Sequence, residues 1–258
     1  MSQSKSAPTQ RFSDRVDDYV KYRPHYSAEV LAALQAVCEL KANHKIVDVG
    51  CGTGLLAEIF LKNGNPVIGV EPNAAMRAAG VEYLSSYPKF SMVAGSAEET
   101  TLPRHCADFV VAGQAFHWFQ PKPTRTEFAR IAKPEGWVVL IWHDREMEAT
   151  PFLRAYEGFL QRYATDYSLV AHNKVANYSA LEHFYSPNRM QMVTQDTLQE
   201  FDYEGLRGRL LSSSYAPREG PGAEAMLREL PRLFAQYEED GRVLFRYHTR
   251  IYYGHLTA

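Results

Sequence analysis

The chain is 258 residues long and carries 28 lysines and arginines against 30 aspartates and glutamates, a formal net charge of −2. Hydrophobic residues make up 45% and charged residues 22%, which excludes a disordered, collagen-like or coiled-coil chain. No apolar run approaches the roughly 18 residues that a membrane-spanning helix needs. The near-zero charge argues against a protein that binds nucleic acid mainly by neutralising phosphates.

Residues 1–11 are polar and lack the apolar segment of a secretory signal, so we expect them to form a disordered tail. The three cysteines, Cys38, Cys51 and Cys106, have no metal-ligand spacing and cannot all pair. A sparse, odd count of this kind is typical of the reducing cytoplasm. We therefore expect a cytoplasmic protein without a metal site, in which each thiol is a small apolar packing residue.

Short apolar segments alternate with amphipathic segments along the first 145 residues. Ser27 is a good helix N-cap, and apolar residues follow it at helical spacing as far as Cys38. Further strands and helices are predicted in chain order at Lys45–Val49 (strand), Leu55–Lys62 (helix), Pro66–Val70 (strand), Ala74–Leu84 (helix), Phe90–Ala94 and Asp108–Ala112 (strands), Thr124–Ala132 (helix) and Gly136–Trp142 (strand). This alternation indicates βαβ units and a parallel sheet.

The pattern changes after Thr150, and 11 of the 16 tyrosines lie beyond this point. Residues 151–187 are expected to be partly helical, and another helix is expected at Ala223–Glu238. Gln191–Glu200 and Arg242–His255 have the alternation or β-rich composition of antiparallel strands. The expected fold class is therefore α/β, with one mostly parallel seven-stranded sheet, C-terminal antiparallel strands and a helical cap.

A glycine-rich loop follows the first predicted strand, in the sequence Val47-Asp48-Val49-Gly50-Cys51-Gly52-Thr53-Gly54. Alternating glycines between a strand and a helix let the backbone turn tightly and approach a ligand closely. Nucleotide cofactors bind at this carboxyl edge of such sheets. Leu55, however, stands where the dinucleotide fingerprint G-x-G-x-x-G has its third glycine.

Two acids identify the kind of ligand that this loop suits. Asp48 would repel a pyrophosphate but would attract the positive end of an amino-acid moiety. Glu71 comes 17 residues after Gly54, at the end of the next predicted strand, where a carboxylate can accept both hydroxyls of an unphosphorylated ribose. The combination indicates an adenosine that carries a cationic amino-acid tail, which describes S-adenosylmethionine.

Several stretches resemble the motifs of class I S-adenosylmethionine-dependent methyltransferases. They are VDVGCGTG (47–54) and IGVEPN (68–73) for the first two motifs, GSAEETTLP (95–103) for the third, AGQAFHWF (112–119) for the fourth and KPEGWVVLIW (133–142) for the strand-five region. Glu135 replaces the first glycine that is usual in the last of these. The lead-in FSDRVDDYVKYRPHY (12–26) resembles that of small-molecule members, including the trans-aconitate methyltransferase-like group.

The resemblance implies a Rossmann-like fold and S-adenosyl-L-methionine as the cofactor. It implies one domain over residues 12–258, with a cofactor-binding core at 12–145 and a substrate cap with antiparallel strands at 146–258. Residues expected at the methionine half are Asp48, Gly50, Cys51, Gly52, Thr53, Gly54 and Gln114. Residues expected at the ribose and adenine are Glu71, Pro72, Asn73, Met76, Ser96, Ala97 and Glu98. Tyr22 and Arg23 are expected to close over the cofactor, with Arg23 facing its carboxylate.

Methyl transfer from a sulfonium requires mainly that the acceptor be aligned and water excluded, so a catalytic dyad is not needed. His117 and His143 follow the fourth and fifth predicted strands and are candidate bases or substrate donors, although each could instead be structural. Candidate substrate contacts are Trp118, Arg145, Ser214 and Tyr215. Arg145 with the loop containing Ser214 and Tyr215 could bind an anionic acceptor, although a solvated polar loop is the alternative.

The leading hypothesis is methyl transfer to an oxygen of a small-molecule acceptor, with a carboxylate as one candidate. An RNA methyltransferase would need a basic groove with stacking aromatic residues, and residues 205–258 have only a slight excess of arginine over acid. A non-catalytic S-adenosylmethionine-binding module is a further alternative. Asp48 and Leu55 argue against a NAD-dependent oxidoreductase. We expect no nucleic-acid partner, no membrane association, and a monomer or homodimer.

Overall fold

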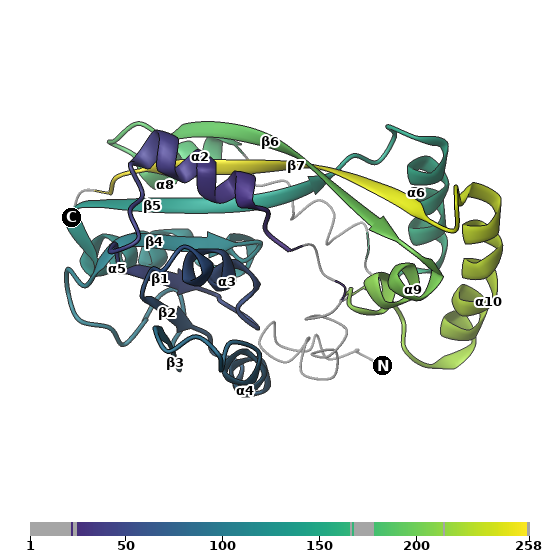
Figure 1. Ribbon diagram of the computed structural model, residues 1–258, viewed down its shortest axis with the longest axis horizontal. Helices are drawn as coiled ribbons and strands as arrows, with labels where there is room; N and C mark the ends of the chain where they lie inside the picture. The colour runs from purple at the N-terminus through teal and green to yellow at the C-terminus, as the bar shows by residue number, and fades with distance from the viewer. Residues whose placement is uncertain (1–21, 23–24, 166, 168–177, 214, 257–258) are drawn as a thin grey trace.

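A computed structural model describes residues 22, 25–165, 167, 178–213 and 215–256 (Figure 1). The predicted tail at 1–11, most of the lead-in, Arg23 and Ser214 therefore lie outside the described residues. The helices are α2 (Ala28–Cys38), α3 (Leu55–Lys62), α4 (Ala74–Tyr83), the short 3₁₀ helix η2 (Phe116–Trp118), α5 (Pro121–Ile131), α6 (Pro151–Tyr163), α8 (Tyr178–Tyr185), α9 (Tyr203–Leu211) and α10 (Gly220–Tyr237). The strands are β1 (Ile46–Val49), β2 (Val67–Val70), β3 (Phe90–Val93), β4 (Ala107–Gly113), β5 (Ala132–Arg145), β6 (Gln191–Phe201) and β7 (Val243–Gly254).

The strands form one sheet in the order β3-β2-β1-β4-β5-β7-β6. The first five strands in this order are parallel to one another, and β7 is antiparallel to both β5 and β6. Helices between parallel strands supply the crossover connections that such a sheet requires. The expected fold class, a Rossmann-like and mostly parallel seven-stranded sheet with antiparallel C-terminal strands, is confirmed.

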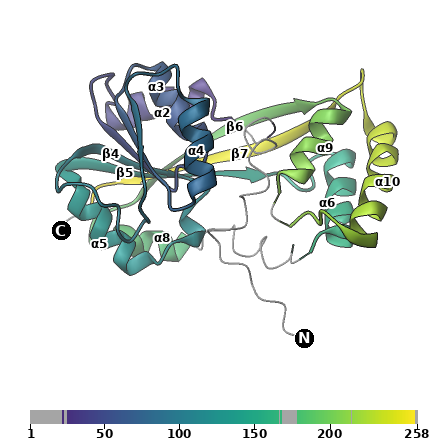
Figure 2. The ribbon, with the colours of Figure 1, turned by 90° about the horizontal axis from the view of Figure 1, so that it is seen from below.

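Helices cover both faces of the parallel part of the sheet (Figure 2). The first hydrophobic cluster packs α2 and α3 on one face, with Leu34 and Phe60 against Ile46. The second cluster packs α5 and α8 on the other face, with Phe128 and Phe184 against the sheet. Burial on both faces explains why β1 is apolar at every position except Asp48.

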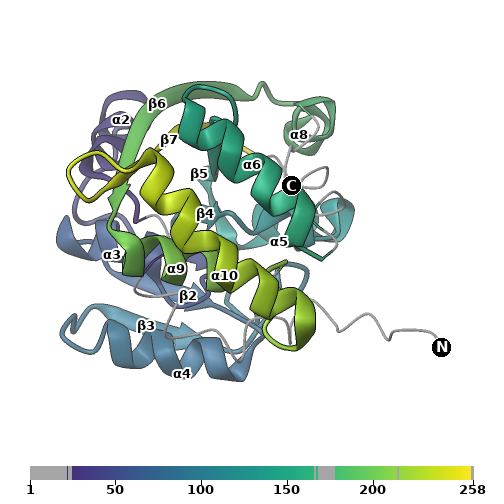
Figure 3. The ribbon, with the colours of Figure 1, turned by 90° about the vertical axis from the view of Figure 1, so that its right-hand side faces the viewer.

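The three longest strands, β5, β7 and β6, continue beyond the parallel core and carry a helical cap made of α6, α9 and α10 (Figures 1 and 3). A third hydrophobic cluster fills this cap, with Tyr156 of α6, Leu206 of α9 and Leu230 of α10 packed against Phe245 of β7. Because alternate residues of a strand share a face, Phe245 lies on the same side of β7 as Ile251 of the first cluster. The cap therefore covers the sheet face that also holds α2 and α3.

Two elements differ from the expectation in a way that matters for the site. The fifth strand runs to Arg145, so His143 and Arg145 lie within β5 rather than after it, because β7 pairs with this extension. Helix α9 was not predicted, because Gly205 and Gly208 lower its helix propensity. The Asp202 carboxylate caps it by accepting from the Gly205 amide at 2.7 Å.

Phe245 tests whether the cap cluster contributes to the stability of the whole chain. It is 1% exposed and contacts the rings of Phe152, Tyr156 and Phe201. We expect Phe245→Ala to lower the free energy of unfolding, measured in urea, by about 3–5 kcal/mol. The control Leu198→Ala, at a side chain that is 61% exposed on β6, should change it by less than about 0.5 kcal/mol. Equal effects of the two substitutions would contradict this packing.

Candidate functional site

The turn between β1 and α3 has a backbone that only glycine adopts without strain. Gly50, Gly52 and Gly54 have φ angles of 69°, 58° and 90°. A Cβ atom at Gly50 would lie 2.7 Å from the Ala115 Cβ, and one at Gly54 would lie 2.4 Å from the Leu84 Cδ1. The turn is therefore packed from both sides, and its conformation is fixed before any ligand binds.

Asp48 lies at the base of this turn and is 1% exposed. Neither of its carboxylate oxygens has a hydrogen-bond partner of good geometry among the described residues, although Cys51 and the Ala57 backbone lie close enough to stabilise its ionised form. Burial raises the pKa of Asp48 to about 7; the nearby Glu71 carboxylate adds to the rise, and polar groups of Cys51 and Ala57 oppose it. A buried carboxylate without a partner is a strong acceptor for a cationic group that can reach it.

The two remaining residues of the turn are buried as well. Thr53 is 0% exposed, and its hydroxyl has no partner within the described part of the chain. The pKa of the Cys51 thiol is raised, first by burial and then by the Asp48 charge, so that it is an unreactive packing group. The polar atoms of Asp48 and Thr53 lie beside the glycine turn and can bind a polar ligand there.

Glu71, at the end of β2, ties the next loop to the glycine turn. One of its oxygens accepts from the Gly52 amide at 3.0 Å, and the other accepts from the Asn73 amide at 2.9 Å. Burial raises the pKa of Glu71, and these two amides together with Arg77 oppose the rise. Each carboxylate oxygen has two lone pairs, so Glu71 can still accept the hydroxyls of a ribose.

The residues predicted beside the adenine lie around the start of α4. Asn73 caps this helix, because its side-chain oxygen accepts from the Met76 amide at 3.0 Å. Met76 is 4% exposed, and its Cε lies 3.3 Å from the position of a Cβ on Gly52. Pro72 is exposed, and its carbonyl accepts from Arg77 at 2.8 Å. Glu71, Asn73 and Met76 are thus brought to the glycine turn.

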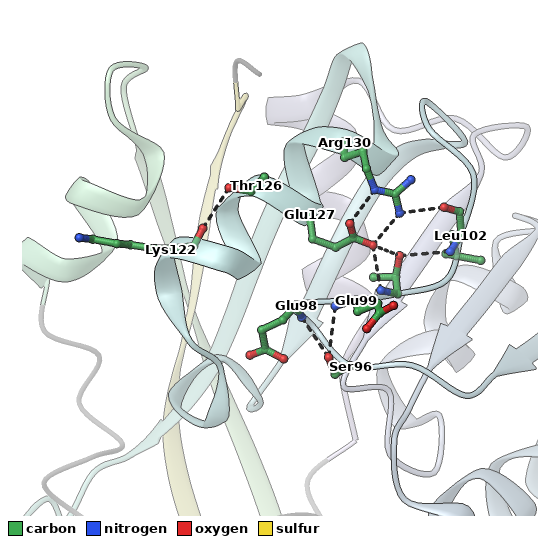
Figure 4. A network of polar contacts seen from close by, with 9 residues as sticks. Ser96, Glu98, Glu99, Leu102, Lys122, Thr126, Glu127 and Arg130 are labelled. Atoms are coloured by element: carbon green, nitrogen blue, oxygen red, sulfur yellow. Dashed lines mark hydrogen bonds and ion pairs between the residues drawn. The ribbon is translucent and has the colours of Figure 1, made fainter.

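The loop after β3 contains the third predicted group, Ser96, Ala97 and Glu98. The Ser96 hydroxyl accepts from the amides of Glu98 and Glu99 at 3.2 Å each (Figure 4). Glu98 accepts from the Gln120 amide at 2.8 Å, and Ala97 is buried in the second cluster. These contacts hold the loop in a defined turn that faces the same carboxyl edge of the sheet.

An anchor on α5 holds this loop in place (Figure 4). Glu127 accepts from the amide and the hydroxyl of Thr100, and from Arg130 Nε at 2.6 Å. Arg130 in turn donates to the Leu102 carbonyl at 2.8 Å. Although burial opposes it, the Arg130 and Thr100 donors lower the pKa of Glu127. A charged anchor of this kind fixes the loop that carries Ser96.

Gln114 and Tyr26 cover the ends of β4 and β5. Gln114 has a φ angle of 56°, its amide donates to the Ile141 carbonyl at 2.9 Å, and its side chain donates to the His143 carbonyl at 3.3 Å. The Tyr26 ring lies 4.5 Å from the His143 ring, and its oxygen would be 2.2 Å from a Cβ on Gly113. Tyr26 was not predicted as a site residue, although it ends the aromatic lead-in.

His143 is a neutral, oriented imidazole. Its Nδ1 lies 2.7 Å from the Thr249 hydroxyl, which lies 2.8 Å from the Thr197 hydroxyl. Its Nε2 is buried and has no partner among the described residues. Burial, and then the charge of Arg209, lowers the pKa of His143 to about 4. His143 can therefore form a hydrogen bond through Nε2, but at neutral pH it is a weak base.

The other candidate histidine, His117, lies in η2 with Trp118. Their rings are 4.7 Å apart, and Trp118 is 36% exposed. The neighbours Ala115 and Phe119, rather than this pair, pack on Gly50. No group of three His, Cys, Asp or Glu side chains that could hold a metal ion occurs in the described part of the chain.

Arg145 and Tyr215 meet under the cap. Arg145 Nη2 lies 2.6 Å from a Glu157 oxygen and donates to the Tyr167 hydroxyl at 3.0 Å. Its guanidinium lies 5.1 Å from the centre of the Tyr156 ring. Tyr215 is 4% exposed, with its ring 4.9 Å from that of Tyr167. The sequence analysis named Arg145 and Tyr215 as separate candidates, and the structure places both in one buried cluster of arginine and tyrosine side chains.

Tyr22, expected over the cofactor, packs on the cap. A Cβ added to Gly208 of α9 would lie 2.1 Å from the Tyr22 ring. The second glycine of α9 is therefore needed for this close approach. Tyr22 extends the cap side of the site, and its expected contact with the cofactor stays a prediction.

Comparisons with known proteins agree with this architecture. Residues 47–140 match a family model described as a methyltransferase domain. A relative named uncharacterized methyltransferase Rv3342, from Mycobacterium tuberculosis, is 31% identical over 136 residues, which are 52% of this chain and 53% of the relative. Another, named ubiquinone biosynthesis O-methyltransferase, from Nitrosospira multiformis, is 33% identical over 103 residues, 38% of this chain and 42% of the relative. This chain therefore matches about half the length of the first relative and less than half the length of the second.

The crystal structure of the YcgJ protein from Bacillus subtilis is similar over most of the chain. The TM-score is 0.58 at 18% sequence identity, and the match covers 90% of this chain and 100% of that one. At this identity the likeness concerns the fold alone. This likeness in fold agrees with the match of residues 47–140 to the methyltransferase-domain model.

The raised pKa of Asp48 has a consequence for stability. The folded chain holds a proton on Asp48 up to about pH 7, whereas the ordinary value is 3.8, so the native state loses stability as pH rises through this window. Asn cannot ionise, so Asp48→Asn should gain stability relative to the wild type between about pH 5 and about pH 8, by roughly 2.5 kcal/mol. Urea unfolding at both pH values measures this difference.

The matched control is Asp240→Asn, at an exposed turn residue with a φ angle of 51°, which Asn tolerates. Its stability should follow the wild type at both pH values. A stability difference between Asp48→Asn and wild type that does not change with pH would show that Asp48 is not an uncompensated buried carboxylate.

Proposed function

We propose that the protein is an S-adenosylmethionine-dependent methyltransferase that acts on an oxygen of a small-molecule acceptor. The observation that carries this proposal is the buried Asp48 carboxylate, which has no partner among the described residues and lies under a turn of positive-φ glycines. The α-amino group of the cofactor is a cation of the right size to neutralise it. The methyltransferase-domain match over residues 47–140 supports the same assignment.

The residues present fit this cofactor. Asp48 and Thr53 would hold the methionine half, Glu71 would accept the ribose hydroxyls, and Asn73 and Met76 would lie beside the adenine. When bound, the cofactor supplies an electrophilic methyl group on a sulfonium that leaves readily. The remaining task of the protein is to align an acceptor and exclude water, which can lower the barrier by about 7–11 kcal/mol.

The acceptor side favours an oxygen that is already ionised. His143 has a pKa of about 4, so at neutral pH it is too weak a base to remove a proton efficiently from a hydroxyl. A carboxylate acceptor needs no base. The resemblance of residues 12–26 to the trans-aconitate methyltransferase-like group also implies a carboxylate, and the relative named an O-methyltransferase supports oxygen as the accepting atom.

The cellular setting belongs to the same proposal. No helix in the described part of the chain is long and apolar enough to cross a membrane. Cys38, Cys51 and Cys106 are free thiols, which suits a reducing compartment, and we propose a cytoplasmic monomer or homodimer without a nucleic-acid partner. The division into a cofactor core at 12–145 and a substrate part at 146–258 is proposed with it.

Labelled methyl transfer tests the activity directly. The wild-type chain is incubated with methyl-labelled S-adenosylmethionine and, in separate reactions, a pool of small carboxylic acids and total RNA. We expect label in alkali-labile esters of the small acids. Label in RNA alone would replace this proposal with the RNA methyltransferase, and cofactor binding without transfer to either would favour the non-catalytic module.

Glu71 offers a sharper test of how the cofactor is held. Removing a charged hydrogen-bond acceptor costs about 1.5–3 kcal/mol, so Glu71→Gln should weaken S-adenosylmethionine about 10–100-fold in calorimetry. An analogue without the ribose hydroxyls should lose much less. The control Glu99→Gln, an exposed residue of the loop after β3, should bind both ligands as the wild type does. Equal losses of both ligands in Glu71→Gln would exclude a ribose contact.

A further inference from the structure

Polar side chains are buried on the sheet face between the first cluster and the cap cluster. The register of β5 with β7 places His143 opposite Thr249 and Arg145 opposite Tyr247. Arg209 comes from α9, a cap helix that lies between α10 and the parallel core (Figures 1 and 2). Burial, and then the charge of Arg209, lower the pKa of His143, so β5 and α9 bring a histidine and an arginine near one another beside Thr249 and Tyr247 of β7.

Arg209 is a buried cation that has no ion pair in the described part of the chain. It is 8% exposed, its Nη1 donates to the Ser213 hydroxyl at 3.0 Å, and its Nε is buried without a partner among these residues. Burial lowers the pKa of Arg209, but Tyr247, Tyr215 and Tyr156 raise it, and none of these three groups is a carboxylate. Removing a guanidinium from water without a counter-charge is strongly unfavourable.

Arg145 leaves a second donor unused. Its Nη2 is taken by Glu157 and Tyr167, but its Nη1 is buried and has no partner among the described residues. Glu157 also accepts from the Tyr167 hydroxyl at 2.7 Å. Tyr156 and Tyr215 affect the pKa of both arginines, and the centre of the Tyr156 ring lies 5.1 Å from the Arg145 guanidinium, so the two guanidinium groups belong to one cluster in which Glu157 is the carboxylate partner that the described residues supply. Among the described residues of this cluster, one positive charge therefore has no carboxylate partner.

We propose that Arg145 and Arg209 bind a carboxylate of the acceptor, and that this carboxylate is a handle rather than the group that is methylated. One unbalanced positive charge matches a monoanionic carboxylate, whereas a phosphate monoester would bring nearly two negative charges. The carboxylate oxygens accept hydrogen bonds from the guanidinium groups, so their lone pairs are less available to attack the methyl group and these oxygens are poor nucleophiles. The accepting oxygen is therefore a second group of the same molecule, on the side of His143 and the glycine turn.

This assignment rests on the proposed function and adds to it a specific requirement on the acceptor. It also links the handle to His143. The charge of Arg209 helps to lower the pKa of His143, so a carboxylate bound to Arg209 offsets that effect and raises the pKa again. Occupancy of the anion site can thus be read at a neighbouring side chain without any turnover.

Anion binding to the cofactor-free wild-type chain provides the first measurement. Acetate, succinate and inorganic phosphate are titrated at constant ionic strength against chloride, and the thermal unfolding midpoint is recorded. We expect acetate and succinate to raise the midpoint in a saturable way and phosphate to raise it less. No rise with either carboxylate, or an equal or larger rise with phosphate, would overturn the proposal.

Arg209→Met removes the charge and keeps an apolar side chain of similar length. Without ligand it should be as stable as the wild type or more stable, because a buried unpaired charge is gone, and its affinity for acetate and succinate should fall at least about tenfold. The control Arg232→Met, at an exposed arginine of α10, should leave both properties unchanged. A variant that binds carboxylates as the wild type does, or that is destabilised without ligand, would overturn the assignment.

The imidazole protons of His143, identified by their loss in His143→Gln, give the second readout. Saturating succinate should raise the pKa of His143 in the wild type and should not change it in Arg209→Met. An unchanged His143 titration in wild type with bound succinate would contradict the placement of the anion. Because these measurements use no cofactor, their failure rejects the carboxylate site and leaves the proposed function standing. Failure to bind S-adenosylmethionine rejects the proposed function and leaves an anion site that is no longer assigned to a methyl acceptor.

Discussion

The buried carboxyl group of Asp48, which has no counter-charge among the described residues, is the constraint on which the rest of the site depends. Asp48 is held between β2 and β4 by the register of the sheet, opposite Gly69 and Val111, and cannot move out to solvent without breaking β1. The glycine turn above it has a backbone fixed by packing. The folded chain therefore holds this carboxyl group at a defined position, and a cation bound over the turn would stabilise its ionised form.

The opposite arrangement occurs at the other end of the same sheet face. Arg209 and Arg145 leave a positive charge under the cap that Glu157 balances only in part within the described residues. Within the described residues, the chain thus holds a carboxyl group without a counter-charge at one site and a pair of arginines with one carboxylate partner at the other. The long strands β5 and β7, which join the core to the cap, fix the separation between them. A cation bound at the first site and an anion bound at the second would offset the cost of burying these groups. Ligands that lack the matching charge would leave that cost in place, so the two sites would select ligands by charge.

The local parts of this arrangement are readable in the sequence. Alternation of apolar segments predicts the parallel strands and the helices between them, and the glycine spacing with Asp48 and Glu71 predicts the cofactor edge, because each depends on neighbours within a few residues. The acceptor side depends on contacts across the chain. Arg209 lies in a helix whose two glycines make it a poor helix former, and His143 belongs to a strand only because β7, about a hundred residues later, pairs with it. No local pattern carries that information.

The most direct test of the central claim is the pH dependence of cofactor affinity, measured by calorimetry for the wild type and Asp48→Asn. If Asp48 must be ionised to hold the ammonium group, wild-type affinity for S-adenosylmethionine falls about tenfold per pH unit below about pH 7, and the variant binds weakly with little change. Methylthioadenosine, which has no ammonium group, should bind both proteins equally at each pH. Parallel pH profiles of the wild type and Asp48→Asn for S-adenosylmethionine would contradict the account.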